Sequence, residues 1–302
     1  MTARAPRVVD AHHHVWDLTV RDQDWISGPA LAPLRRNFDL DELRPQARAA
    51  GVDSTVLVQT VCVPEETPEL LALADTDPLV AGVVGWTDLT CADIADNLAA
   101  LRAGAGGEHL VGIRHQVQSE PDPEWLLRPD VQRGLRAVAA AGLAYDLVIT
   151  AEQLPAATAA AISLPGAVFV LDHLGKPPVA ERALAPWAGH LRAFAALPNT
   201  AAKVSGLVTE ADWHRWQPAD LRPFVDVALD AFGPGRLLFG SDWPVSTLAA
   251  DYSRVVAVTR DLLAPLTPGE REAVFGGNAE RLYRLTQTAE ARPGSTRIHP
   301  TL

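Results

Sequence analysis

The sequence predicts a single (β/α)8 barrel, also called a TIM barrel. Eight short apolar runs are typical of parallel strands buried on both faces, and helix-like stretches rich in Ala, Leu and Arg lie between them. Eight such alternations in 302 residues fit the usual length of this fold. A doubly wound open sheet is the alternative, but no strand is followed by the glycine-rich phosphate loop of that fold.

The expected elements follow in order along the chain. The strands cover residues 8–15, 54–61, 79–87, 110–117, 144–149, 167–171, 200–204 and 237–240. The clearest helices cover residues 91–102, 123–141, 151–162, 181–197, 219–232 and 251–263. Gly104 and Gly142 lie where the first two of these helices should end, because glycine accepts the backbone conformation that closes a helix.

Two segments add to the plain repeat. Residues 18–38, which include Trp25, are too long for a tight turn after the first strand, and insertions at that edge often form lids or specificity loops. A last helix is expected over about 278–285, with Asn278 as its N-cap. We therefore expect one domain over residues 1–302, with an inserted loop, a C-terminal helix and a tail from about 288 to 302.

Composition excludes several classes of partner. A net charge of −11 argues against nucleic acid and against an anionic membrane surface. No apolar run is long enough to span a bilayer, and residues 1–7 lack the apolar core of a signal peptide. With only Cys62 and Cys91, no disulfide framework is indicated, so a cytoplasmic location is expected. The composition is compatible with a homo-oligomer.

The run from Asp10 to His14 is the most informative part of the chain. Alternation along a strand places Asp10, His12 and His14 on one face and His13 on the other. Two imidazoles on one face form a chelating pair suited to a divalent cation or to a polarised carbonyl. His13 is expected to be structural. Asp10 is expected to orient a histidine or to accept a hydrogen bond within the strand.

Functional residues of such a barrel lie at the carboxyl ends of its strands. Those ends add His173 and Asp242 to the first-strand pair, and Asp146, which either caps the following helix or joins the site. Candidate substrate contacts are Arg114, His115, Lys176, Lys203, Trp25, Trp86 and Trp243. For His115 and the tryptophans, ordinary packing and hydrogen bonding is an equally good interpretation.

Six segments of the chain resemble the amidohydrolase superfamily. They are residues 10–17, 112–116, 171–177, 203–211, 239–244 and 277–283. The resemblance is greatest to the branch that contains sugar-acid lactonases such as L-fuconolactonase and L-rhamnonolactonase, and the 2-pyrone-4,6-dicarboxylate lactonase. The order and spacing of the segments carry the superfamily assignment, whereas the substrate is much less specified.

The resemblance implies roles for four residues. His12, His14 and His173 would bind a metal or the substrate carbonyl, and Asp242 would activate water, so all four are candidate metal ligands. Members with two metals carry a lysine or glutamate on the fourth strand and a histidine on the fifth. Here the fifth strand ends in Tyr145 and Asp146, so the resemblance implies one divalent metal, zinc first, or none.

The leading hypothesis is a hydrolase that opens the ring of an aldono-1,4- or 1,5-lactone. Asp242 would activate water, with its pKa raised by burial, while the histidines or one metal polarise the carbonyl. The partner would then be a small lactone. The alternatives are a metal-dependent decarboxylase of the same superfamily, an amide or ester hydrolase of another substrate, and a non-catalytic binding barrel.

Overall fold

Eight parallel strands form the centre of the computed structural model, which describes residues 6–285. They are β1 (Val9–His13), β2 (Ser54–Val58), β3 (Val80–Gly85), β4 (Leu110–His115), β5 (Ala144–Leu147), β6 (Val168–Leu171), β7 (Thr200–Val204) and β8 (Leu237–Phe239). Each strand pairs with the next in chain order. A parallel bridge from His13 to Trp243 returns β8 to β1. The predicted (β/α)8 barrel is confirmed.

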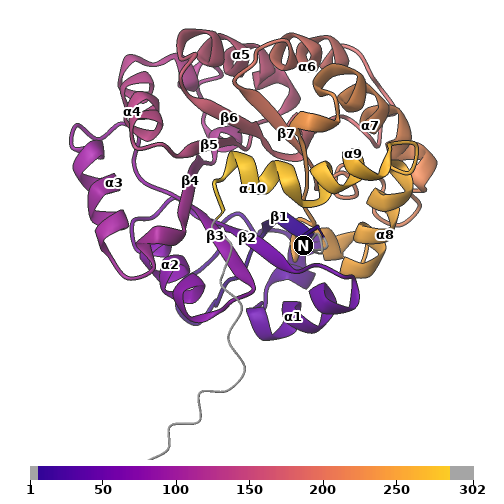
Figure 1. Ribbon diagram of the computed structural model, residues 1–302, viewed down its shortest axis with the longest axis horizontal. Helices are drawn as coiled ribbons and strands as arrows, with labels where there is room; N and C mark the ends of the chain where they lie inside the picture. Colours follow the sequence, from indigo (N-terminus) through magenta and orange to yellow (C-terminus); the bar gives the residue numbers. More distant parts are fainter. Residues whose placement is uncertain (1–5, 286–302) are drawn as a thin grey trace, which may run out of the picture.

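A ring of helices surrounds the strands (Figure 1). It comprises α1 (Leu40–Ala49), α2 (Glu66–Thr76), α3 (Ile94–Ala103), α4 (Pro129–Ala140), α5 (Leu154–Ser163), α6 (Trp187–Ala195), α7 (Pro218–Phe232) and α8 (Tyr252–Leu262). The sequence analysis did not include α1 and α2 among the clearest helices. Pro45 interrupts the pattern of α1, which nevertheless begins at a good N-cap, since Asp39 accepts a hydrogen bond from the Glu42 amide.

Two of the expected helices are shorter than predicted, and proline explains both. Residues 123–141 form a 3₁₀ turn, Trp125–Leu127, and then α4, because Arg128 is extended ahead of Pro129. Of residues 181–197, only α6 is an α-helix, and it begins directly after Pro186.

The predicted start of the last helix is wrong. A continuous helical run begins with α9 (Pro268–Glu272), passes through a π-helical turn and ends with α10 (Asn278–Leu282). Its N-cap is Thr267, which accepts from the Glu270 amide. Asn278 lies inside the run, and its side-chain amide donates to the carbonyls of Pro234 and Leu237. The expected tail lies outside the described residues.

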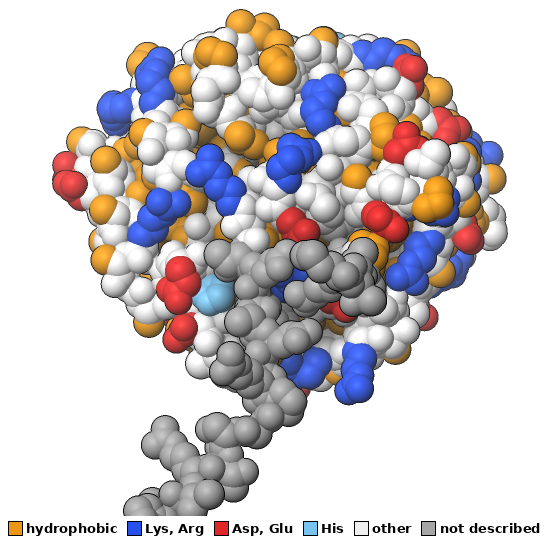
Figure 2. Space-filling view, in the orientation of Figure 1, with side chains coloured by type: hydrophobic (Ala, Val, Ile, Leu, Met, Phe, Trp, Pro, Cys, Tyr) orange, Lys and Arg blue, Asp and Glu red, His pale blue; other side chains and the backbone are white. Residues whose placement is uncertain are grey.

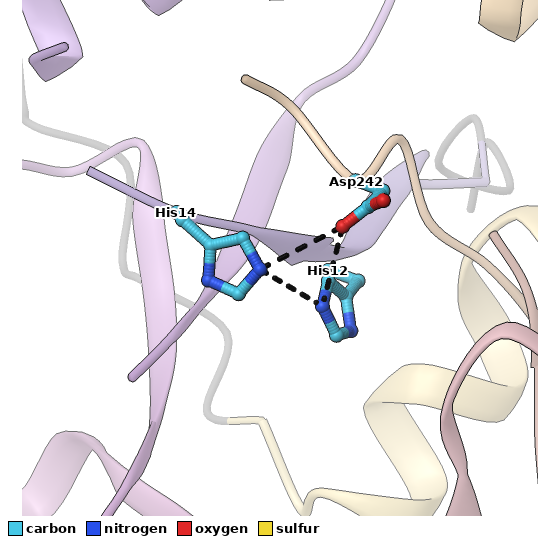
Figure 3. Close-up of side chains that lie close together, drawn as sticks. All are labelled: His12, His14 and Asp242. Atoms are coloured by element: carbon cyan, nitrogen blue, oxygen red, sulfur yellow. Dashed lines mark hydrogen bonds and ion pairs between the residues drawn. The ribbon is translucent and has the colours of Figure 1, made fainter. Parts of the chain in front are cut away.

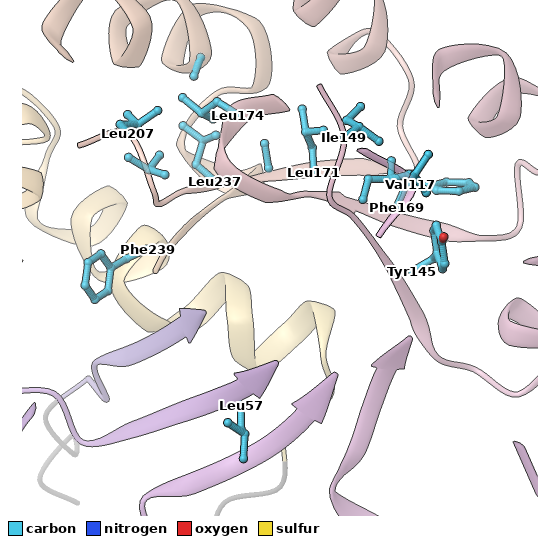
Figure 4. Close-up of a cluster of buried hydrophobic side chains, with 14 of the residues drawn as sticks. Leu57, Val117, Tyr145, Ile149, Phe169, Leu171, Leu174, Leu207, Leu237 and Phe239 are labelled. Atoms are coloured by element: carbon cyan, nitrogen blue, oxygen red, sulfur yellow. The ribbon is translucent and has the colours of Figure 1, made fainter. Parts of the chain in front are cut away.

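Two apolar cores hold the structure together. The larger one lies between the barrel and its helices, and Figure 4 shows part of it. The smaller one fills the barrel with Val and Ala side chains and includes Tyr283 and Leu285, which follow α10. α10 crosses one end of the barrel in Figure 1. The barrel is therefore closed with apolar residues at one end, which leaves the other end for a polar site.

The inserted loop after β1 is tied down at both ends. Trp16 and Phe38 form an antiparallel bridge at its base, and the loop contains a 3₁₀ helix, Pro29–Leu34. Trp25 packs edge-on against Trp16, with ring centroids 5.6 Å apart. The loop is thus a structured wall over the carboxyl ends of the strands.

Two features of the described part of the chain bear on membranes and polyanions: the length of its helices and the charge of its surface. None of its helices is long and apolar enough to cross a membrane. On the face that Figure 2 shows, acidic and basic side chains are interspersed with apolar ones and do not gather into one basic patch.

The strand alternation predicted for β1 is interrupted. Its register against β2 slips between Asp10 and His13, as in a β-bulge. Asp10 therefore points toward α8, where its carboxylate accepts from the Tyr252 hydroxyl at 3.0 Å and from the Ser241 amide at 2.8 Å. Asp10 holds β8 against β1 and does not contact a histidine ring.

Burial of Asp10 predicts a pH-dependent stability. Burial raises the pKa of Asp10 to about 6, although its hydrogen bonds to Ser241, His12 and Tyr252 oppose the rise. Because the folded pKa exceeds the unfolded value, the stability that this group contributes is present at low pH and lost as pH rises through 6. Asp10→Asn should remove that loss, so its stability relative to the natural protein should increase by about 3 kcal/mol between pH 4 and pH 8.

Urea denaturation of both proteins across that pH range measures the difference. Asp53→Asn is the matched control, since Asp53 is exposed and accepts from the Val8 amide. A constant offset between Asp10→Asn and the natural protein at all pH values would contradict the prediction.

Candidate active site

Four polar side chains meet at the carboxyl ends of the strands. The Asp242 Oδ1 atom lies 3.7 Å from the Nε2 atom of His12, 3.6 Å from that of His14 and 3.8 Å from that of His173. Figure 3 shows His12 and His14 on β1 and the following segment, with Asp242 approaching from the chain after β8. The structure thus brings together the four residues that the sequence predicted as catalytic or metal-binding.

Backbone conformations at the site are unusual. His173 and Asp242 have φ values of 54° and 58°, in the left-handed region that few residues other than glycine adopt. Gly206 allows the chain after β7 to approach them, because a Cβ there would lie 2.5 Å from the His173 ring and 3.1 Å from the Asp242 carboxylate. A glycine at this position is therefore a requirement of the cluster.

Hydrogen bonds fix two of the histidine rings. The Nδ1 atom of His14 lies 2.8 Å from the carbonyl oxygen of Val58, so it carries the ring proton and leaves Nε2 with a lone pair toward the cluster. The Nδ1 atom of His173 pairs with the Ser205 hydroxyl at 2.9 Å. Burial lowers the pKa of His173 to about 4, even though Asp242 opposes the shift, so this ring is neutral at pH 7.

Asp242 is an anion in this setting. Burial alone would raise the pKa of its carboxyl, but His173 and His14 hold the pKa below its ordinary value. The expectation that burial raises this pKa is therefore wrong, because the neighbouring imidazoles outweigh the loss of water. At neutral pH the group is ready to accept a proton or a cation.

The residues present fit a divalent metal. In tetrahedral zinc sites with Zn–N distances of about 2.0–2.1 Å, ligand atoms are separated by about 3.3 Å. The Nε2 atoms of His12 and His14 are 3.2 Å apart, and Asp242 Oδ1 lies within 3.7 Å of each. These three residues form a group of potential ligand atoms, and His12 forms another with Asp172 and His173. Imidazole nitrogen and carboxylate oxygen are ordinary zinc ligands.

A buried layer of charge lies beneath His12. The Lys203 ammonium is fully buried and lies 2.5 Å from Asp146, 2.9 Å from Asp172 and 3.1 Å from His12 Nδ1. Arg114 donates to Asp172 at 3.0 Å. Asp146 does not cap a helix, because its carboxylate pairs with Lys203 inside the barrel.

This layer connects the site to the closed end of the barrel. The Tyr283 hydroxyl, which follows α10, donates to Asp146 at 2.8 Å. Burial disfavours the charged form of Asp172 and would raise its pKa, but Lys203 and His12 hold that pKa well below the ordinary value. The carboxylate and the ammonium therefore form a buried ion pair directly under the histidine–aspartate cluster.

The cluster opens into a polar cleft of about 120 Å³. Among the residues predicted to contact substrate, Trp25, Arg114 and Lys176 line this cleft together with His14, His173 and Asp242. Two larger grooves, of about 800 and 590 Å³, lie against α2 on the outside of the barrel and contain none of these histidines. The small cleft is therefore the candidate binding site.

Two of the predicted substrate contacts are buried away from the cleft. The structure places Lys203 below the cluster in the charge layer, and Trp243 is fully buried beside Phe38. Lys203 lies inside the barrel, and the base of the inserted loop covers Trp243. Neither side chain therefore lines the cleft.

Trp86 and His115 form a separate cluster. The Trp86 indole donates to His115 Nδ1 at 3.0 Å, and His115 Nε2 lies 2.7 Å from Glu120. The His115 ring stacks on Trp125 at 4.3 Å. The ring is thus engaged on both nitrogens and one face, outside the cleft.

The cleft also contains polar residues that the sequence analysis did not predict as substrate contacts. They are Thr60, Gln116, Gln118, Thr209 and Glu210. The Glu210 carboxylate lies 3.9 Å from the Lys176 ammonium, and burial raises its pKa although Lys176 opposes the shift. Both residues follow strands at the carboxyl end of the barrel, and Glu210 also lies within residues 203–211, one of the segments that resemble the superfamily.

The barrel and its histidine–aspartate cluster define an enzyme of the (β/α)8-barrel class with a hydrolytic type of site. Residues 9–285 match the family model described as amidohydrolase. The chain belongs to the amidohydrolase family. It is 41% identical over 295 residues to an L-fucono-1,5-lactonase from Burkholderia multivorans, and the match covers 94% of this chain and 98% of that relative.

Solved structures share the fold of this chain. An amidohydrolase from Burkholderia multivorans with bound zinc superimposes with a TM-score of 0.88 and 38% identity, covering 93% of this chain and 100% of that one. A probable 2-pyrone-4,6-dicarboxylic acid hydrolase from Acinetobacter baumannii shares the fold, with a TM-score of 0.74 and 16% identity over 92% of this chain and 99% of that one.

Proposed function

We propose that this protein hydrolyses the cyclic ester of a sugar-acid lactone, with L-fucono-1,5-lactone as the first substrate to test. The observation that carries the proposal is the Asp242 carboxylate within 3.8 Å of three imidazole Nε2 atoms at the floor of a polar cleft. The 41% identity to an L-fucono-1,5-lactonase over 94% of the chain supports this choice of substrate.

The chemistry follows from the positions of the side chains. Lactone hydrolysis needs a base for the attacking water and a partner for the charge that develops on the carbonyl oxygen. Asp242 is ionised and accepts the proton of that water. His12 and His173, which are neutral and surround Asp242, donate hydrogen bonds to the carbonyl oxygen when they carry their protons on Nε2.

A divalent metal, with zinc as the first candidate, would be held by His12, His14 and Asp242, with His173 adjacent. When bound, such an ion supplies Lewis acidity toward the carbonyl and lowers the pKa of a bound water. The zinc in the similar structure from Burkholderia multivorans supports this expectation. One metal is proposed, because Tyr145 and Asp146 stand where two-metal relatives are expected to have a histidine.

The cleft walls suit a polyhydroxylated ring. Lys176 and Glu210 form a donor–acceptor pair for sugar hydroxyls, and the buried Arg114 side chain also lines the cleft. The Trp25 indole offers an apolar face for a sugar ring. We expect a cytoplasmic location, because both cysteines are free thiols, as in proteins of reducing compartments.

The test is a pH-indicator hydrolysis assay on L-fucono-1,5-lactone, other aldono-1,4- and 1,5-lactones and a dicarboxylate lactone. Chelator-treated protein and protein restored with zinc are compared with spontaneous hydrolysis at the same pH. We expect hydrolysis of sugar lactones well above the spontaneous rate.

Rates equal to the spontaneous rate for every lactone, in both metal states, would overturn the proposal. CO2 release from aromatic carboxylic acids would then be measured, because a decarboxylase is the alternative within the same superfamily.

A further inference from the structure

The Nδ1 atom of His12 has two buried partners of opposite kind. The Lys203 ammonium lies 3.1 Å away and the Asp172 Oδ1 atom 3.3 Å away. An ammonium only donates hydrogen bonds and a carboxylate only accepts them. Without its proton, Nδ1 accepts from Lys203; with its proton, it faces Asp172 Oδ1, a buried acceptor that otherwise has no hydrogen-bond partner among the described residues.

The Nε2 atom of His12 has the same pair of choices. The Arg114 guanidinium, which only donates, lies 3.4 Å away. The Nε2 atom of His14 lies 3.2 Å away and accepts, because the Val58 carbonyl already takes the proton of the other ring nitrogen. Each nitrogen of His12 thus faces a donor and an acceptor, and Nε2 also faces the Asp242 carboxylate 3.7 Å away.

Two complete hydrogen-bonding states follow. In one, Nε2 carries the proton and donates to His14, while Nδ1 accepts from Lys203. In the other, Nδ1 donates to Asp172 and Nε2 accepts from Arg114. The ring therefore holds one proton in both states, and only its position changes.

We propose that Lys203 and Asp172 are positioning residues that allow His12 to move its proton between the two ring nitrogens. Without metal, Lys203 keeps the proton on Nε2, from which His12 donates to the carbonyl of a bound substrate. With a divalent cation, the proton lies on Nδ1, which donates a hydrogen bond to Asp172, and the Nε2 lone pair is free as a ligand. The substrate half of this statement rests on the proposed function, whereas the cation half does not.

Nitrogen NMR of protein labelled with ¹⁵N-histidine tests the proposal directly. The His12 signals are assigned by their loss in His12→Gln. In chelator-treated protein we expect His12 Nδ1 to be unprotonated, and after one equivalent of zinc we expect it to be protonated. His14 is the internal control, because the Val58 carbonyl should keep its Nδ1 protonated in both states. A His12 that carries its proton on Nδ1 without metal would overturn the proposal.

Zinc affinity, measured by competition with a chromogenic chelator, adds a second test, because substitutions of Lys203 and Asp172 should change it in opposite directions. Lys203→Met should tighten zinc binding, because it removes the donor that holds the metal-free state. Asp172→Asn should weaken it about 10- to 100-fold. Two merely structural residues would both weaken binding, and that outcome would overturn the proposal.

The NMR and zinc-affinity measurements test the proposal on His12 independently of the proposed function. If Lys203→Met does not fold, the NMR spectra of the natural protein still decide, since they need no variant of the charge layer. Neither measurement uses a lactone, so an absence of lactone hydrolysis would leave the result on His12 intact.

Discussion

Replacing Asp242 by asparagine is expected to lower kcat for lactone hydrolysis about 1000-fold without unfolding the protein. The amide cannot accept the proton of the attacking water, whereas the carboxylate is held ionised by His173 and His14. The fold should survive because Asp242 has a φ of 58°, and asparagine adopts this left-handed conformation readily.

Steady-state kinetics and thermal unfolding of Asp242→Asn measure the two halves of this expectation. Asp251→Asn is the matched control. It makes the same change nine positions along the chain, at the N-cap of α8, where asparagine caps as well as aspartate. A variant at Asp242 that retains the natural kcat/KM would remove this residue from the mechanism.

The fold could be predicted because it depends on repetition. Apolar runs at regular spacing specify eight strands, and the structure has eight strands in that order. Helix limits were less predictable where proline intervenes, as before α4 and α6. The last helix shows the same limit, because a polar side chain such as Asn278 can serve a neighbouring loop as readily as a helix end.

Asp242 and the three histidines around it could be predicted by the same reasoning, since parallel strands bring their carboxyl ends to one edge of a barrel. The sequence could not predict how deep within the barrel each of these side chains lies. Lys203 lies on the inward face of β7, as the substrate role requires, but one layer too low to reach the cleft. That depth depends on Asp146, on Tyr283 after α10 and on the β-bulge in β1, none of which has a local sequence pattern.

The buried charge layer predicts the largest effect on stability. Lys203→Met should lower the free energy of unfolding by about 3–5 kcal/mol, because it leaves Asp146 and Asp172 buried without their shared cation. Lys176→Met is the matched control, since the only other lysine of the chain is partly exposed and lies 3.9 Å from its carboxylate partner. That substitution should cost less than about 1 kcal/mol.

The pH dependence of the Lys203→Met deficit identifies its cause. Burial already raises the pKa of Asp146 although Lys203 opposes the rise, and loss of the ammonium should raise it further. A carboxyl with a raised folded pKa is tolerated when protonated and becomes costly as pH rises through that pKa. Urea denaturation should therefore show a deficit that is larger at pH 8 than at pH 5. An equal deficit at both pH values would mean that lost packing of the lysine side chain, and not an uncompensated buried charge, destabilises the barrel.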